Sequence, residues 1–146
     1  MTKKLLFILL LLSNTALADD LHKVELVRVI DGDTVEVRYT TAIRLVDIEC
    51  YENKNNERSD REALEYNKTK EEVLTAGKQS EQKLKELLKG NENNLYLKVN
   101  SLDRYKRILG KLFIGKDENK KDVNNYMLKS GGCLPYKKLP KIKRGG

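Results

Sequence analysis

The stretch VRVIDGDTVEVRY, residues 27–39, holds a tight turn between two strand-like segments. Apolar and polar residues alternate on both sides of the DGDT turn at residues 31–34, which is the pattern of half-buried β-strands. A hairpin turn needs only one residue such as Gly or Asn. This turn also carries two carboxylates and a hydroxyl, and a second acidic segment, RLVDIECYE, follows at residues 44–52. The two acidic segments therefore require a chemical explanation.

The flanking sequence predicts a β-rich domain. Segments rich in Val, Ile and Thr with alternating polarity predict strands at residues 23–30, 34–39, 42–48, 95–99 and 108–114. Short connections between the first three favour an antiparallel meander. With helices after the third and fifth strands, the order predicts an α+β fold, mostly β: a five-stranded OB-fold Greek-key barrel with two or three helices. Such barrels bind oligonucleotides on an open face, although a fold alone does not fix a function.

Three segments are candidates for those helices. Residues 78–89 form the clearest one, because Leu84, Leu87 and Leu88 make one apolar stripe and Gly90 follows as a C-terminal cap. Residues 60–74 are charged and only weakly amphipathic, and residues 123–129 form a short third candidate.

The N-terminus has the pattern of a secretory signal peptide. Two lysines at positions 3 and 4 precede an apolar run at residues 5–12 and the small-residue sequence Ala-Leu-Ala at residues 16–18. The apolar run is too short to span a bilayer as a helix. The predicted organisation is a signal peptide, residues 1–18, and one domain, residues 19–146, secreted or periplasmic and free of the membrane after cleavage. The alternative is an uncleaved anchor.

Charge and rare residues narrow the chemistry. The chain has 29 basic and 22 acidic residues, and loss of residues 1–18 lowers the net charge from +7 to +5. This balance suits a polyanionic partner, but also an ordinary charged surface. The single histidine, His22, argues against a histidine-based zinc site or a Ser-His-Asp triad. The two cysteines, Cys50 and Cys133, suggest a disulfide in an exported protein, with two buried thiols as the alternative.

The acidic segments suit a hard cation. Asp31 and Asp33 flank a glycine at a strand end, and the second segment brings Arg44, Glu49 and Glu52. Carboxylate oxygens are ligands for Ca²⁺, and an arginine beside them suits an anionic substrate. Taken alone, each segment also reads as a hairpin turn or a charged strand edge.

A basic loop adds candidate contacts to nucleic acid. The sequence DRYKRILGKL, residues 103–112, places Arg104, Tyr105 and Arg107 within four residues. Basic side chains around one aromatic ring suit phosphate and base contacts. The plain alternative is a solvated hairpin connection.

Together these segments resemble the staphylococcal nuclease family. The resemblance rests on four motifs in order, VIDGDTV, RLVDIECYE, DRYKRILG and DVNNYMLKSG, and covers residues 24–136. It implies a calcium-dependent nuclease that hydrolyses phosphodiester bonds of DNA and RNA, a monomer with no stable protein partner. Two alternatives are a catalytically inactive OB-fold module that binds nucleic acid and a structural or adhesion module of the cell envelope.

The resemblance also implies roles for individual residues. Calcium would be held by Asp33, Glu49 and the backbone carbonyl of Cys50, with Asp31 shaping the site. The catalytic residues would be Arg44 and Arg107, which hold the scissile phosphate, and Glu52, which orients or deprotonates the attacking water. The substrate-binding residues would be Arg104, Tyr105 and Tyr136. In the family fold the segment after Gly131 runs beside the end of the third strand, which would bring Cys133 to Cys50.

The sequence departs from the family pattern at three places. Glu49 is one methylene longer than the usual Asp, and an alternative register makes Asp47 the metal ligand. Tyr51 replaces the usual proline. About a dozen extra residues lie between Glu52 and Gly77, where an added helix would shape access to the site.

Overall fold

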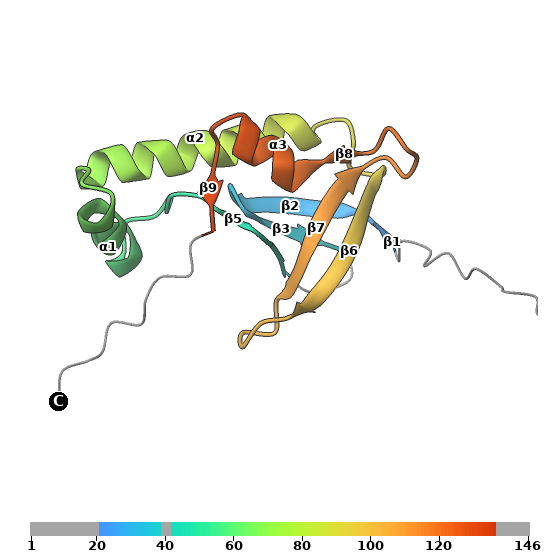
Figure 1. Ribbon diagram of the computed structural model, residues 1–146, viewed down its shortest axis with the longest axis horizontal. Coiled ribbons are helices and arrows are strands. Elements are labelled where there is room, and N and C mark those ends of the chain that lie inside the picture. The colour runs from blue at the N-terminus through green and yellow to red at the C-terminus, as the bar shows by residue number, and fades with distance from the viewer. Residues whose placement is uncertain (1–20, 39–41, 137–146) are drawn as a thin grey trace, which may run out of the picture.

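The computed structural model describes residues 21–38 and 42–136, which form a curved sheet covered by helices (Figure 1). The predicted signal peptide and the basic tail after Tyr136 lie outside these residues. Within the described ranges, no helix has both the length and the apolar character needed to cross a membrane.

The main sheet has the predicted Greek-key order. Its path runs β1-β6-β7-β4-β3-β2, and β8 pairs with β7. The strands are β1 (Leu21–Val24), β2 (Leu26–Asp31), β3 (Thr34–Val37), β4 (Ala42–Leu45), β6 (Leu95–Leu102), β7 (Ile108–Ile114) and β8 (Lys121–Asp122). All neighbours pair antiparallel except β4 and β7, which are parallel. This parallel pair closes the Greek key after the chain returns from the helices.

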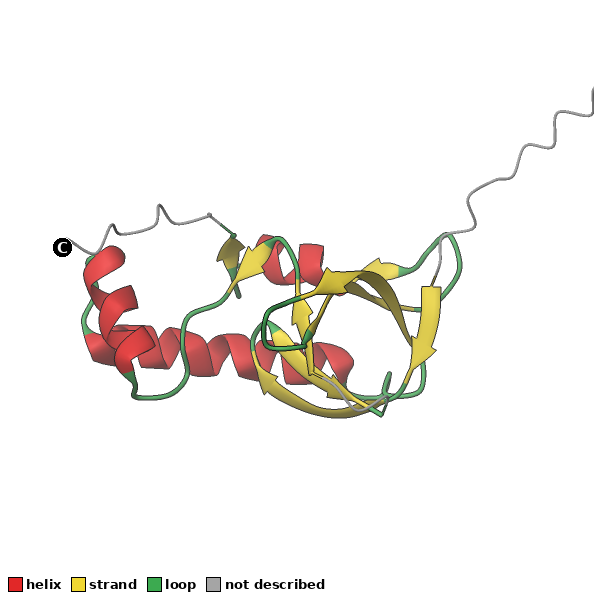
Figure 2. Cartoon of the chain, turned by 90° about the horizontal axis from the view of Figure 1, so that it is seen from below, coloured by secondary structure: helices red, strands yellow, loops and turns green. Residues whose placement is uncertain are grey.

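The sheet curls until its two ends meet at one residue. β1 and β2 lie at opposite ends of the path, yet only Glu25 separates them in sequence. The strands therefore form a ring when viewed end-on (Figure 2). Among the described residues the ring is joined here by the chain and not by pairing between β1 and β2, so the ladder is not a closed barrel.

Two predicted strands are shorter than the sequence indicated. The strand expected at residues 23–30 is interrupted at Glu25, where β1 turns to pair with β6 and β2 pairs with β3. The strand expected at residues 42–48 ends at Leu45, because Asp47 adopts a positive φ of 66° in a turn. The chain then forms β5 (Ile48–Glu49), which pairs antiparallel with β9 (Leu134–Pro135) in a separate two-stranded sheet.

The helices also correct the prediction. The helices are α1 (Glu57–Glu65), α2 (Lys70–Leu88) and α3 (Val123–Lys129). The single helix predicted at residues 60–74 was wrong, because capping boxes start two separate helices, one at Asn56 with Ser59 and one at Thr69 with Glu72. α2 is thus a continuous helix of 19 residues instead of one that begins at residue 78.

The core fills the space between the curled sheet and one half of α2. Leu84 and Leu88 of α2 are fully buried against sheet residues such as Val35 and Leu112. Burying a side chain of this size contributes about 1.5–3 kcal/mol. The other half of α2 extends past the sheet to α1 (Figures 1 and 2). This extension holds α1 beside the part of the acidic segment that follows β5.

Gly77 allows that segment to cross α2 closely. A Cβ atom built at Gly77 would lie 2.3 Å from the carbonyl oxygen of Glu52 and 2.8 Å from the amide nitrogen of Asn53. The glycine therefore lies inside a helix, where its low helix propensity costs about 1 kcal/mol, because the backbone of Glu52 leaves no room for a side chain.

Gly77→Ala is expected to destabilise the protein by about 1–3 kcal/mol, although alanine is the better helix former, because overpacking must displace the Glu52 backbone. Urea denaturation measures the effect. Thr75→Ala, at an exposed position of the same helix, controls for helix propensity. A stability gain in Gly77→Ala similar to that in the control would show that the Glu52 segment moves freely.

Candidate active site

The turn between β2 and β3 buries a carboxylate. Asp33 is 3% exposed, and its Oδ2 accepts a hydrogen bond of 2.9 Å from the backbone N–H of Cys50. Its Oδ1 accepts a bond from the hydroxyl of Thr34 at 3.1 Å. A Cβ at Gly32 would lie 2.6 Å from that of Ser80. The turn is therefore packed against α2 and against the second acidic segment, which accounts for its glycine and hydroxyl.

A second carboxylate lies beside Asp33. The backbone N–H of Asp33 donates to Oδ1 of Asp31 at 3.2 Å. Burial and the neighbouring charge of Asp33 raise the pKa of Asp31 to about 7. The two carboxylates therefore disfavour each other's charged form, and a cation bound at this end of the strands would relieve that repulsion.

Arg44 on β4 faces this turn and is firmly held. Its Nη1 lies 3.4 Å from Oδ2 of Asp33, and its Nη2 lies 2.6 Å from Oε2 of Glu49. The same two nitrogens donate to the backbone carbonyls of Leu45 at 2.7 Å and Ile48 at 2.9 Å. With its side chain only 12% exposed, the guanidinium is fixed by partners on several sides.

Glu49, and not Asp47, reaches this arginine. The side chain of Asp47 is 70% exposed and pairs with Lys111 at 3.5 Å, on the turn before β5. Burial raises the pKa of Glu49, while the charges of Arg44 and Arg58 oppose that rise. Glu49 is therefore the carboxylate of the second segment that shares a partner with Asp33.

Arg58 of α1 is a site residue that sequence reasoning missed. Its Nη2 forms an ion pair with Oε1 of Glu49, and its Nε lies 2.9 Å from Oε1 of Glu62. Burial lowers the pKa of Arg58, but the surrounding carboxylates of Glu49, Asp33 and Glu62 outweigh burial and raise it. The only sequence signal was its place in the inserted segment after RLVDIECYE.

Glu52 takes part in a turn at the end of this acidic segment. Its Oε1 accepts hydrogen bonds from the backbone N–H groups of Asn53 at 2.9 Å and Lys54 at 3.0 Å. Its own N–H donates to Oε2 of Glu62 at 2.7 Å. The carboxylate of Glu62 therefore connects the backbone of Glu52 to Arg58.

The β6–β7 hairpin carries the basic loop, which projects beyond the rest of the sheet (Figure 1). Arg107 is held by Asp103, whose Oδ2 lies 2.7 Å from its Nε and whose Oδ1 accepts its backbone N–H at 2.9 Å. Arg104 and Arg107 lie 4.8 and 5.6 Å from the ring centre of Tyr105. The role of Asp103 in fixing Arg107 was not predicted from the sequence.

A pocket of about 500 Å³ joins this loop to β4. Five residues predicted for catalysis or substrate binding line it: Arg44, Arg104, Tyr105, Arg107 and Tyr136. Tyr136 is placed there because its N–H donates to the carbonyl of Asp47 at 3.0 Å. Glu52, Asp33 and Glu49 do not line the pocket. Among the described residues that line the pocket, only Arg44 forms ion pairs with the acidic group, which is the pair of carboxylates of Asp33 and Glu49.

The acidic group has the donor chemistry of a calcium site but is not a ready-made metal cluster. Asp33 and Glu49 offer carboxylate oxygens on either side of Arg44, and hard oxygen donors suit Ca²⁺. Among the described residues, no three side chains of His, Cys, Asp or Glu converge as they would around a bound metal. Two carboxylates alone would leave the other positions around a calcium ion to backbone and water oxygens.

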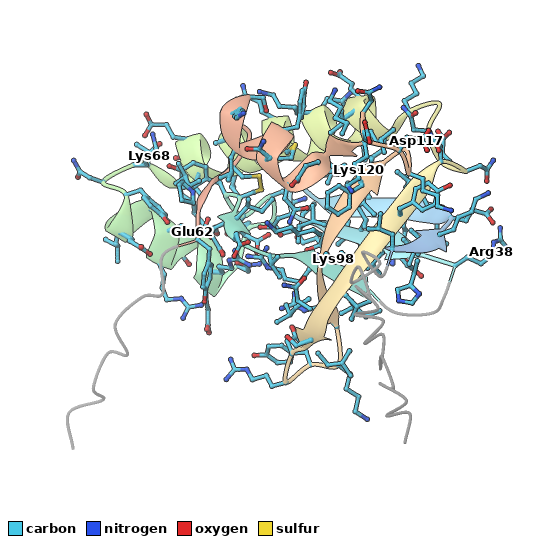
Figure 3. The ribbon with its side chains drawn as sticks, turned by 45° about the vertical axis from the view of Figure 1, so that its right-hand side comes forward. Arg38, Glu62, Lys68, Lys98, Asp117 and Lys120 are labelled. Atoms are coloured by element: carbon cyan, nitrogen blue, oxygen red, sulfur yellow. A yellow bond between two sulfur atoms is a disulfide. The ribbon has the colours of Figure 1, made fainter. Side chains whose placement is uncertain are left out.

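Cys50 and Cys133 form a disulfide behind the acidic group, with their Cα atoms 4.2 Å apart (Figure 3, yellow bond). Both residues are buried, and the Sγ of Cys133 lies 3.6 Å from the carbonyl of Gly32. The bridge connects the segment after α3 to the end of β5. It thereby fixes the backbone of Cys50, whose N–H binds Asp33.

Comparison with known proteins agrees with this architecture. A search of curated proteins found no match. The sequence profile of the family described as "Staphylococcal nuclease homologue" matches residues 42–144, a span that includes β4, the acidic segment after it and the β6–β7 hairpin. The match covers most of the chain and both sides of the arginine-lined pocket. The chain therefore belongs to the staphylococcal nuclease family, which supports a nuclease-like or nucleic-acid-binding role for its domain.

Proposed function

We propose that the protein is an exported, calcium-dependent nuclease that hydrolyses phosphodiester bonds of DNA and RNA as a monomer. The observation that carries the proposal is the position of Arg44, which contacts the acidic group on one side and lines the basic pocket on the other. A phosphodiester in the pocket would lie next to the carboxylates. N-terminal sequencing of the exported protein, with a start near Asp19, tests the export.

Arg44 and Arg107 are suited to hold the scissile phosphate. A planar guanidinium matches two phosphate oxygens, and this pairing strengthens as charge develops in the transition state. Arg44 is fixed by the carbonyls of Leu45 and Ile48, and Arg107 by Asp103. Arg107 is held through its Nε, whereas both Nη atoms of Arg44 are engaged, so Arg44 would release a carboxylate contact, to Asp33 or Glu49, when it binds phosphate.

The carboxylates are suited to hold the metal and the water. Asp33, Glu49 and the carbonyl of Cys50 would bind Ca²⁺, which neutralises a non-bridging phosphate oxygen and lowers the cost of attack by water. From the part of the chain that the structure describes, the backbone N–H groups of Asn53 and Lys54 bind the carboxylate of Glu52, and both use Oε1. Its Oε2 is therefore the atom we assign to orienting the attacking water.

Asp33→Asn is expected to lower the hydrolysis of single-stranded DNA at least tenfold, because it removes a metal carboxylate while keeping its shape. The rate is measured over a series of Ca²⁺ concentrations. Asp117→Asn, an exposed change at the opposite end of the molecule from Glu62 (Figure 3), is the control. Equal rates in the two variants, or full activity with Zn²⁺ in place of Ca²⁺, would remove the calcium assignment.

A further inference from the structure

Helix α1 is docked on the acidic segment by three contacts. The rings of Tyr66 and Tyr51 pack edge to face with centres 5.2 Å apart. Arg58 pairs with Glu49, and Glu62 accepts the backbone N–H of Glu52. Glu62 lies on the side of α1 that faces the strands (Figure 3). The inserted helix is therefore built into the site.

The side chain of Arg58 is held in place by Glu62 of the same helix. Arg58 and Glu62 are one turn apart, with Nε and Oε1 separated by 2.9 Å. Glu62 is only 6% exposed and uses its second oxygen to bind the N–H of Glu52. A charged side chain buried to this extent is costly unless it is paired. The pair thus fixes the direction in which the guanidinium of Arg58 points.

Glu49 is shared between two arginines. Its Oε2 contacts Arg44, and its Oε1 contacts Arg58. The extra methylene of glutamate, compared with aspartate, gives the carboxylate the reach to contact both β4 and α1. Three departures from the family pattern, at Glu49, at Tyr51 and in the inserted helix, are therefore connected by direct contacts.

The two arginines differ in how readily each can release an oxygen of Glu49 to a cation. Arg44 also donates to two backbone carbonyls, whereas within the described ranges the guanidinium of Arg58 contacts only carboxylates. The side chain of Arg58 is also 36% exposed, against 12% for Arg44. A cation that binds Glu49 is therefore in competition mainly with Arg58.

We propose that Arg58 is a positioning residue that holds the carboxylate of Glu49 and sets the affinity of the acidic group for a divalent cation by competing with it. The inference rests on the calcium site proposed above. The positive charge of Arg58 takes the place of a metal at Glu49 until a cation binds there, and then repels that cation.

Calcium titration by calorimetry on the full mature protein tests the inference. Arg58→Gln is expected to bind Ca²⁺ about tenfold more tightly than the natural protein, since it removes one positive charge a few ångströms from a divalent ion. Arg58→Lys, which keeps the charge, is expected to bind Ca²⁺ as the natural protein does. Arg61→Gln, an exposed change of equal charge on the same helix, is expected to change the affinity less than twofold.

The outcomes separate this inference from the proposed function. Equal or weaker calcium binding by Arg58→Gln overturns the inference and leaves the calcium site intact. If neither protein binds Ca²⁺, the proposed metal site and the inference both fail. Thermal unfolding in chelator verifies that each variant folds. If Arg58→Gln does not fold, Arg58→Met, which keeps the apolar stem of the side chain, is used in its place.

Discussion

Replacing Arg44 by lysine is expected to lower kcat on single-stranded DNA by about 10²-fold or more. One preorganised donor is worth about 3–4 kcal/mol in a transition state of this kind. Lysine keeps the charge but has no planar fork, and its three N–H groups are too few to replace the bonds to the carbonyls of Leu45 and Ile48 and also bind phosphate at two points. Initial rates at saturating Ca²⁺ measure the loss.

Arg107→Lys is expected to show a loss of the same order, because Arg107 lines the same pocket. Arg38→Lys is the matched control, since Arg38 is an exposed arginine paired with Glu25 and lies at the opposite end of the molecule from Glu62 (Figure 3). Near-normal turnover in both Arg44→Lys and Arg107→Lys would mean that the pocket does not bind the reacting phosphate.

Removing the disulfide is expected to lower the free energy of unfolding by about 4.5 kcal/mol. The bridge joins residues separated by 83 positions, and the chain-entropy model gives about this value for a loop of that length. Urea denaturation of the oxidised protein and of the double variant Cys50→Ser, Cys133→Ser measures the difference.

The natural protein denatured with and without reductant is the control for the effect of the serine hydroxyls. Thiol titration of unfolded, unreduced protein is expected to find no free thiols. Two free thiols per chain, or a stability loss below about 1 kcal/mol in both comparisons, would contradict a structural role for the bridge.

Local pattern was sufficient to predict the fold class. Alternation on both sides of the DGDT turn indicated the first hairpin, and the apolar stripe with Leu84 and Leu88 indicated the helix that covers the core. Motif order assigned Arg44, Arg104, Tyr105, Arg107 and Tyr136 to one site, and these five residues line one pocket, whereas Glu52, assigned to the same site, does not line it. These features depend on neighbours in sequence or on a whole ordered set of motifs.

Features that depend on tertiary contacts were not predicted. The start of α2 at Lys70 was also missed, although the capping box of Thr69 and Glu72 is a local signal for it. The helix predicted at residues 78–89 begins just after Gly77, whereas Gly77 lies inside α2 at the point where the backbone of Glu52 crosses the helix. The contact of Arg58 with Glu49 depends on how an inserted helix docks, and no local pattern in the sequence specifies that.

Hydrolysis of single-stranded DNA by the protein without its proposed signal peptide, residues 19–146, in Ca²⁺ and then in chelator tests the central claim most directly. We expect cleavage of DNA and of RNA with Ca²⁺, its loss with chelator, and its return when Ca²⁺ is restored. Oligonucleotide binding measured in parallel distinguishes an active enzyme from an inactive binding module. Cleavage that persists in chelator, or binding with no cleavage at any Ca²⁺ concentration, would contradict a calcium-dependent nuclease.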